Sequence, residues 1–189
     1  MPTPGIVSAH DAARELRLRK PTAGRTQVMK WLYVAQGLHL AWFGEPMFSE
    51  DIQAWENGPV VAGYWHDLKE NRPTPPASQL DERRHITLKS VLDYWGEMTG
   101  QELSRMTHTD GGPWCQVTEA LDEFSPRNPP ITHEAMKEWF SRHPVTRYRT
   151  EQAAGGSGWT LVPTADAPGL REAVERAMAG EVIQHSGPA

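Results

Sequence analysis

Apolar residues recur at helical spacing along most of the chain, and this pattern predicts a mainly α-helical protein. The most apolar stretch begins after Thr26, which is expected to cap the helix, and it continues to Trp42. A helix that is apolar nearly all the way round belongs at the centre of a domain. Gly44 and Pro46 then end the helix in the expected order. The remaining polar stripe is narrow and is formed by Gln27, Lys30 and Tyr33.

Amphipathic helices are predicted on both sides of this central segment. Their apolar residues lie three and four positions apart, and several begin at a residue suited to capping. We expect helices over Ser8–Leu18, where Ser8 and Asp11 come close to a capping box, over Leu88–Trp95, after Thr99, where Glu102 completes a capping box, and after Thr132. These helices would pack around the central one.

The segment from Ile52 to Trp65 is predicted to hold a short extended piece, a turn and a helix. Its first residues alternate between apolar and polar, which is typical of a short extended piece. Asn57-Gly58 predicts a turn, and Pro59 suits the first position of a helix because its missing N–H is not needed there. That helix would present Val60, Val61, Tyr64, Trp65 and Leu68 on one face. A second turn is predicted at Asp110 to Pro113.

The chain is predicted to form one compact helical bundle with a minor extended element and a C-terminal extension. Its 189 residues suit a single domain, which we place at 8–148. The extension, 149–189, is expected to hold a short strand at Trp159–Pro163, a helix at Leu170–Met178 and a disordered tail beyond Gly180.

Composition narrows the function classes. The net charge is −5, which argues against a general nucleic-acid binder and disfavours a DNA-binding autoregulator. A single cysteine excludes an internal disulfide framework and suggests a reducing compartment. No apolar stretch approaches the length of a membrane span or a signal peptide. We therefore expect a cytoplasmic protein that contacts neither membrane nor nucleic acid directly.

Candidate chemistry is sparse. The sequence contains no metal-binding, phosphate-binding or nucleophile motif, so no cofactor, metal or catalytic residue is expected. His108 and Asp110 flank a turn and raise the alternative of a small enzyme, with Cys115 as a nearby nucleophile. Catalysis requires a complete constellation, which these residues do not supply. The simpler interpretation is that Thr107, His108 and Asp110 hydrogen-bond the turn backbone.

Three ordered segments resemble the Panacea-domain family, whose members include SocA-like antitoxins and phage-associated relatives. The first matches at Lys30, Leu32, Tyr33, Ala35, Gln36, Gly37 and Leu40, followed by Gly44, Pro46, Met47 and Phe48. The second matches at Ile52, Ala54, Trp55, Gly58, Pro59 and Val60, and the third at Met106, Thr107, His108, Gly112, Pro113 and Trp114. Trp31, Met47 and Met106 replace the family's usual leucines, which a core can absorb.

The resemblance implies a cytoplasmic antitoxin that neutralises a cognate protein toxin by direct binding, in a setting such as phage defence. Toxins paired with this family include enzymes that resemble alarmone synthetases and modify transfer RNA. An alternative implied by the resemblance is a proteolytic adapter that delivers the toxin to a Clp-type protease. Whether the protein forms a homodimer stays open.

The resemblance and the aromatic content together suggest where a toxin would bind. The candidates lie around the second segment: Trp55, Glu56, Asn57, Pro59, Tyr64 and Trp65. Central aromatic anchors supply most of the binding energy at interfaces, although burial of Trp55 and Trp65 in the core is the simpler interpretation for each residue taken singly. The motif residues expected to have a structural role are Gln36, Gly37, Gly58, Thr107, His108, Gly112, Pro113 and Trp114. The acidic balance of the chain would suit a basic toxin.

Overall fold

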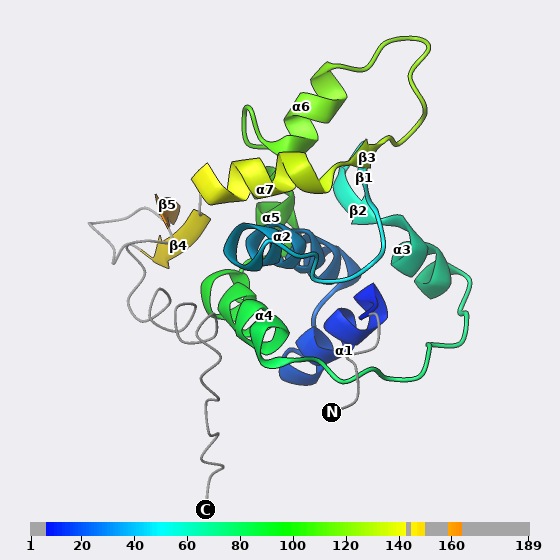
Figure 1. The fold of residues 1–189 in the computed structure, drawn as a ribbon, viewed down its shortest axis with the longest axis vertical. Coiled ribbons are helices and arrows are strands. Elements are labelled where there is room, and N and C mark those ends of the chain that lie inside the picture. Colours follow the sequence, from blue (N-terminus) through cyan, green and yellow to red (C-terminus); the bar gives the residue numbers. More distant parts are fainter. Residues whose placement is uncertain (1–6, 143–144, 150–158, 164–189) are drawn as a thin grey trace, which may run out of the picture.

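A computed structural model describes residues 7–142, 145–149 and 159–163, and this part of the chain is mainly α-helical (Figure 1). The helices are α1 Ala9–Arg19, α2 Arg25–Phe43, α3 Ala62–Lys69, α4 Glu82–Trp95, α5 Gly100–Thr107, α6 Pro113–Glu119 and α7 His133–Arg142. The strands are β1 Ile52–Trp55, β2 Gly58–Val61, β3 Pro130–Ile131, β4 Val145–Arg149 and β5 Trp159–Pro163. The predicted fold class is confirmed.

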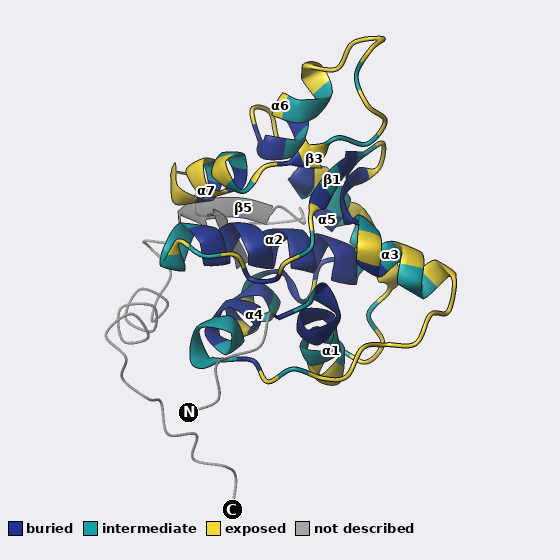
Figure 2. Cartoon of the chain, turned by 45° about the vertical axis from the view of Figure 1, so that its right-hand side comes forward, coloured by how far each residue is buried: buried dark blue, intermediate teal, exposed yellow. Residues whose placement is uncertain are grey.

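Helix α2 is the centre of the bundle, as predicted. Figure 2 shows it buried along most of its length between α7 on one side and α1 and α4 on the other, and every residue from Val28 to Leu40 is buried. The prediction of a polar stripe is wrong for Lys30 and Tyr33, because neighbouring elements cover these side chains too. Thr26 is not the cap either. The helix begins after Gly24, whose N–H donates to Gln27 Oε1 at 2.8 Å.

Gln36 joins α2 to the turn that follows it. Its Oε1 accepts hydrogen bonds from the N–H groups of Met47 (2.8 Å) and Phe48 (3.2 Å), and its Nε2 donates to the Phe48 carbonyl (3.3 Å). The same Nε2 lies 2.9 Å from His133 Nε2, at the start of α7. A fully buried amide that satisfies both of its polar atoms in this way locks three segments together.

Gly37 lets α7 pack closely on α2. A Cβ atom at this position would lie 2.3 Å from ring atoms of Phe140, well inside any normal contact distance. The expected structural role of Gly37 is therefore explained by the close approach of the Phe140 ring to the backbone of α2.

The β1–β2 hairpin replaces the helix start that the sequence predicts at Pro59. Residues 52–55 pair antiparallel with 58–61, Trp55 opposite Gly58, and β3 pairs with the other edge of β1. Helix α3 begins only at Ala62. Pro59 is tolerated because β2 is an edge strand, where a missing N–H breaks no ladder. Gly58 has a φ of 102°, so the predicted turn is confirmed.

The C-terminal part of the chain is described only in part. The predicted strand at Trp159–Pro163 is present as β5 and pairs antiparallel with β4. Because β4 runs to Arg149, the division into a domain at 8–148 and an extension at 149–189 stays a prediction. The helix expected at Leu170–Met178 and the tail beyond Gly180 lie outside the described residues.

His39 is a buried, neutral histidine on α2. Thr87 Oγ1 donates its hydrogen to the Arg83 carbonyl, so His39 Nδ1, 2.8 Å away, must be the donor to that oxygen. Nε2 is then an unprotonated acceptor, and its 3.9 Å approach to Glu45 is not an ion pair. Burial, followed by the positive charge of Arg84, lowers the pKa of His39 to about 3.

This histidine is expected to make the fold acid-labile. Between pH 6.5 and about 3 the unfolded chain binds a proton at His39 that the folded chain does not, so stability falls as the pH falls. The loss attributable to this group approaches about 1.4 kcal/mol per pH unit. Urea denaturation at pH 7, 6, 5 and 4 should show a shallower decline for His39→Gln than for the wild type. The exposed His66→Gln is the control, and equal slopes for all three proteins would contradict the expectation.

Candidate functional site

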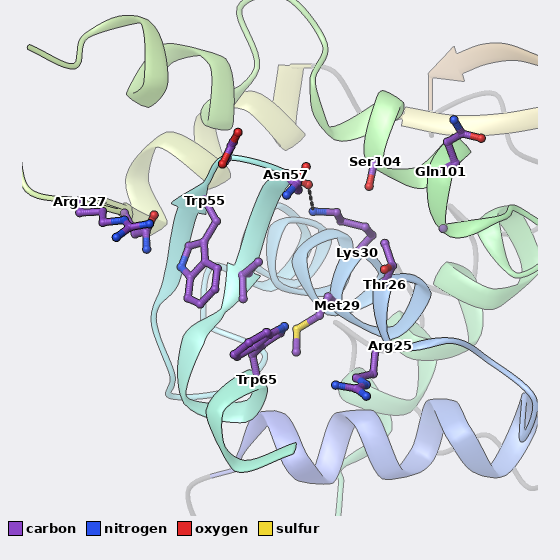
Figure 3. A pocket seen from close by; sticks show the side chains of 14 residues that line it. Arg25, Thr26, Met29, Lys30, Trp55, Asn57, Trp65, Gln101, Ser104 and Arg127 are labelled. Atoms are coloured by element: carbon purple, nitrogen blue, oxygen red, sulfur yellow. Dashed lines mark hydrogen bonds between the residues drawn. The ribbon is translucent and has the colours of Figure 1, made fainter. Parts of the chain in front are cut away.

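A pocket of about 780 Å³ lies beside the β1–β2 hairpin (Figure 3). One wall carries Trp55 and Trp65, and the facing side is formed by the first turns of α2 and by α5. Its lining includes Arg25, Lys30, Trp55, Glu56, Trp65 and Arg127. The pocket therefore combines aromatic surface with several charged groups.

Trp55 and Trp65 form a pair on the pocket wall. Their ring centroids are 5.3 Å apart with the planes tilted by 54°, and both side chains are only partly buried. Lys69 Nζ lies 5.2 Å from the Trp65 ring centroid, and Trp55 Nε1 donates to Gln53 Oε1 at 2.9 Å. Both tryptophans pack against the hydrophobic core, yet each keeps accessible surface at the pocket, so neither is a fully buried core residue.

The other predicted binding residues divide into two groups. Glu56 and Asn57 are exposed at the hairpin turn and remain accessible to a partner. Tyr64 is only 4% exposed and packs edge-to-face against His10, and Pro59 is buried in β2. The expectation that Tyr64 and Pro59 contribute exposed contacts is wrong, because α3 and β2 turn these side chains toward the interior.

Lys30 is a buried cation under the hairpin. It is 2% exposed, and its Nζ donates to the carbonyls of Asn57 (2.9 Å) and Pro59 (3.1 Å), on either side of Gly58. Within the described residues it forms no ion pair. Burial lowers its pKa to about 8, so the ammonium is still largely protonated at neutral pH. These two hydrogen bonds hold the hairpin turn against α2.

His108 follows the end of α5, and its ring approaches Gly58 beside Lys30. Its ring stacks on Trp114 with centroids 3.9 Å apart and planes within 16°, and burial, then Lys30, lowers its pKa. Its Nε2 is buried without a hydrogen-bond partner among the described residues. The expectation that the His108 side chain bonds the turn backbone is therefore wrong. Thr107 does bond backbone, donating to the Ser104 carbonyl at 2.9 Å.

Gly58 is the point where the three family segments meet. A Cβ there would lie 2.5 Å from Lys30 Nζ, 2.9 Å from His108 Nε2 and 3.1 Å from Thr107 Oγ1. Trp114 adds a further link, since its Nε1 donates to the Trp55 carbonyl at 2.9 Å. Gly112 and Pro113 position Trp114 as the N-cap and first residue of α6. The motif residues thus form one structural cluster under the hairpin.

This cluster does not assemble a nucleophilic site. Asp110 is exposed and makes no described contact with His108. Cys115 donates its Sγ hydrogen to the His108 carbonyl at 3.6 Å, and burial, then the charge of Glu119, raises the thiol pKa, so the nucleophilic thiolate is disfavoured. Within residues 7–142, 145–149 and 159–163 no group of His, Cys, Asp and Glu is arranged to hold a metal ion. Nor is any helix in this part of the chain long and apolar enough to cross a membrane.

Arg25 and Arg127 are pocket residues that sequence analysis missed. Arg25 lies in the first turn of α2, and Arg127 precedes β3, whose pairing with β1 brings it to the hairpin. A helical pattern around Arg25 would place it near the start of α2, but nothing in the sequence links position 127 to position 55. Only the β1–β3 pairing reveals that link.

Comparisons with known proteins agree with the motif cluster. Residues 28–115 match the family described as antitoxin SocA-like, Panacea domain. The chain is similar to Antitoxin SocA of Caulobacter vibrioides (strain NA1000 / CB15N), with 27% identity over 107 residues that cover 46% of this chain and 55% of the relative. The match thus spans about half the length of that relative. No solved structure matches. Since the segments that meet at Gly58 all lie within the matched range, residues 28–115 of this chain are a Panacea domain of the SocA-like antitoxin family.

Proposed function

We propose that this protein is an antitoxin that neutralises a cognate protein toxin by binding it directly through the surface around the β1–β2 hairpin. The observation that carries the proposal is the Trp55–Trp65 pair, partly exposed beside a pocket within a Panacea domain. Tryptophan is among the residues most enriched at the energetic centres of protein interfaces.

The hairpin surface is preorganised for binding. Lys30 fixes the turn from below, and the Trp114 indole fixes the Trp55 carbonyl from the side. Side chains and loops that are already ordered lose little entropy when a partner docks. The rigid cluster around Gly58 would thus support the binding surface from beneath.

The finer identity of the partner follows from the family resemblance alone. A transfer-RNA-modifying enzyme that resembles alarmone synthetases is the toxin class that we would test first. We expect the antitoxin to act in the cytoplasm, without enzymatic activity of its own.

The test is co-expression with the product of the adjacent gene. If the proposal is correct, that product arrests growth alone, growth recovers when this protein is present, and the two proteins co-purify in a fixed ratio. Repeating the rescue in a strain that lacks its Clp-type proteases separates the modes of action. Growth rescue that persists in this strain supports neutralisation by direct binding. Growth rescue that disappears assigns the protein to delivery of the toxin to the protease. A toxic neighbour that neither co-purifies nor is neutralised would refute the antitoxin function.

A further inference from the structure

We propose that the pocket beside the hairpin receives an acidic segment of the protein partner, whose carboxylates face the positive charges of Arg25, Lys30 and Arg127. This inference rests on the proposed function and names the chemistry of the toxin surface that the hairpin recognises. Three features of the described residues carry it: the charge of the pocket, the environment of Lys30 and the extent of the adjoining surface.

The charge of the pocket is opposite to that of the whole chain. The protein has a net charge of −5, yet the pocket lining contains three basic residues and one acidic residue, Glu56. Figure 3 shows Arg25 and Arg127 on opposite sides of the tryptophan pair, with Lys30 deeper between the hairpin and α2. The expectation that an acidic surface meets a basic toxin does not suit this face. Complementary charge here favours an acidic partner segment.

Lys30 supplies a buried positive charge with no anion to balance it. Two hydrogens of its Nζ are donated to carbonyl oxygens, which are neutral, and no described carboxylate forms an ion pair with it. A buried charge without a counter-ion is costly, as the lowered pKa of Lys30 reflects. A carboxylate held in the pocket would reduce this cost. In the free protein the buried charge of Lys30 is thus not balanced by a described carboxylate, and an acidic ligand would balance it.

The adjoining surface is extended, which favours a protein segment over a small anion. A second hollow of about 320 Å³ lies next to the pocket and shares Trp55, Glu56, Arg127 and Asn128 with it. Leu121 lines this hollow and is 43% exposed, and the nearby Phe124 is 86% exposed in the same loop. Exposed apolar side chains beside a basic pocket match a partner segment that carries an acidic residue next to apolar ones.

The test compares two double variants with the same change in net charge. Arg25→Gln/Arg127→Gln removes two exposed positive charges from the pocket, whereas Lys89→Gln/Arg142→Gln removes two exposed charges from α4 and α7, away from the pocket. Calorimetric titration with the purified toxin should show Kd raised about tenfold or more for the pocket variant and about twofold or less for the control. The pocket variant should also lose most of the salt dependence of the toxin Kd between about 50 and 300 mM NaCl.

The outcomes separate this inference from the function on which it rests. If the wild type binds the toxin and the pocket variant binds equally tightly, the acidic-segment inference is wrong while the antitoxin function stands. If the wild type itself fails to bind, the proposed function and this inference both fall. Titration of the free protein with ATP, a small anion with an aromatic ring, serves as a third arm. ATP binding that the pocket variant abolishes, without any change in toxin affinity, would assign the pocket to a nucleotide and overturn the inference.

Discussion

Gly58→Val is expected to unfold the domain or to lower its free energy of unfolding by about 3 kcal/mol or more. The φ of 102° at this position is unfavourable for any side chain and especially for a β-branched one. The new Cβ would also lie 2.5 Å from Lys30 Nζ. Lys30 cannot retreat without giving up its hydrogen bonds to the hairpin carbonyls, because both flank Gly58. Strain and lost hydrogen bonds therefore add together.

Gly63→Ala is the matched control for this substitution. Gly63 lies five residues further on, in α3, and a Cβ there meets no atom within 4 Å. Alanine favours the helix by up to about 1 kcal/mol, so the control should be neutral or slightly stabilising. Thermal and urea denaturation followed by circular dichroism measure both variants. A Gly58→Val protein that melts at the wild-type temperature would show that the hairpin turn tolerates another conformation.

Trp65→Ala is expected to abolish toxin neutralisation while leaving the domain folded. Trp65 is partly exposed on α3 and faces the pocket with Trp55, so its removal takes away an anchor of the proposed interface. Truncating a central tryptophan costs about 2 kcal/mol or more of binding free energy, which corresponds to roughly a 30-fold rise in Kd. The growth-rescue assay and calorimetric titration with the purified toxin both report this loss.

Trp42→Ala controls for the loss of a tryptophan as such. Trp42 is also partly buried, and it packs against Phe43 at the far end of α2 from the pocket. We expect this variant to rescue growth and to bind the toxin with nearly wild-type affinity. If Trp65→Ala and Trp42→Ala behave alike, with both neutralising the toxin, the hairpin surface is not where the toxin binds. A thermal melt of each variant confirms that the comparison is between folded proteins.

Local interactions explain why much of the fold can be predicted from the sequence. The capping boxes at Ser8 and Thr99 are made by residues three positions apart, so the pattern alone places the starts of α1 and α5. The near-continuous apolar surface of α2 likewise requires burial on all sides, whatever packs against it. Helix content and the central position of α2 therefore follow from short-range spacing and hydrophobicity.

The hairpin could not be predicted from local pattern because its determinants are distant in sequence. Pro59 suits both the start of a helix and an edge strand, so its own preferences leave the choice open. The strand is selected by pairing with β1 and by Lys30. This lysine lies 27 residues before Asn57 and 29 before Pro59, and its Nζ donates to the carbonyls of both residues, on either side of Gly58. The burial of Tyr64 and Pro59 has the same cause. Because residues 58–61 form a strand and the helix begins only at Ala62, these side chains face the interior.

The candidate site depends even more on tertiary structure. The sequence by itself determined the segments that mark the Panacea domain and the tryptophans that now line the pocket. It did not determine that His108 stacks on Trp114, or that Arg127 reaches the hairpin through the β1–β3 pairing. Net charge is a sum over the whole chain, whereas a pocket's charge depends on which few side chains folding brings together. A basic pocket in an acidic protein is therefore a property that only the tertiary structure decides.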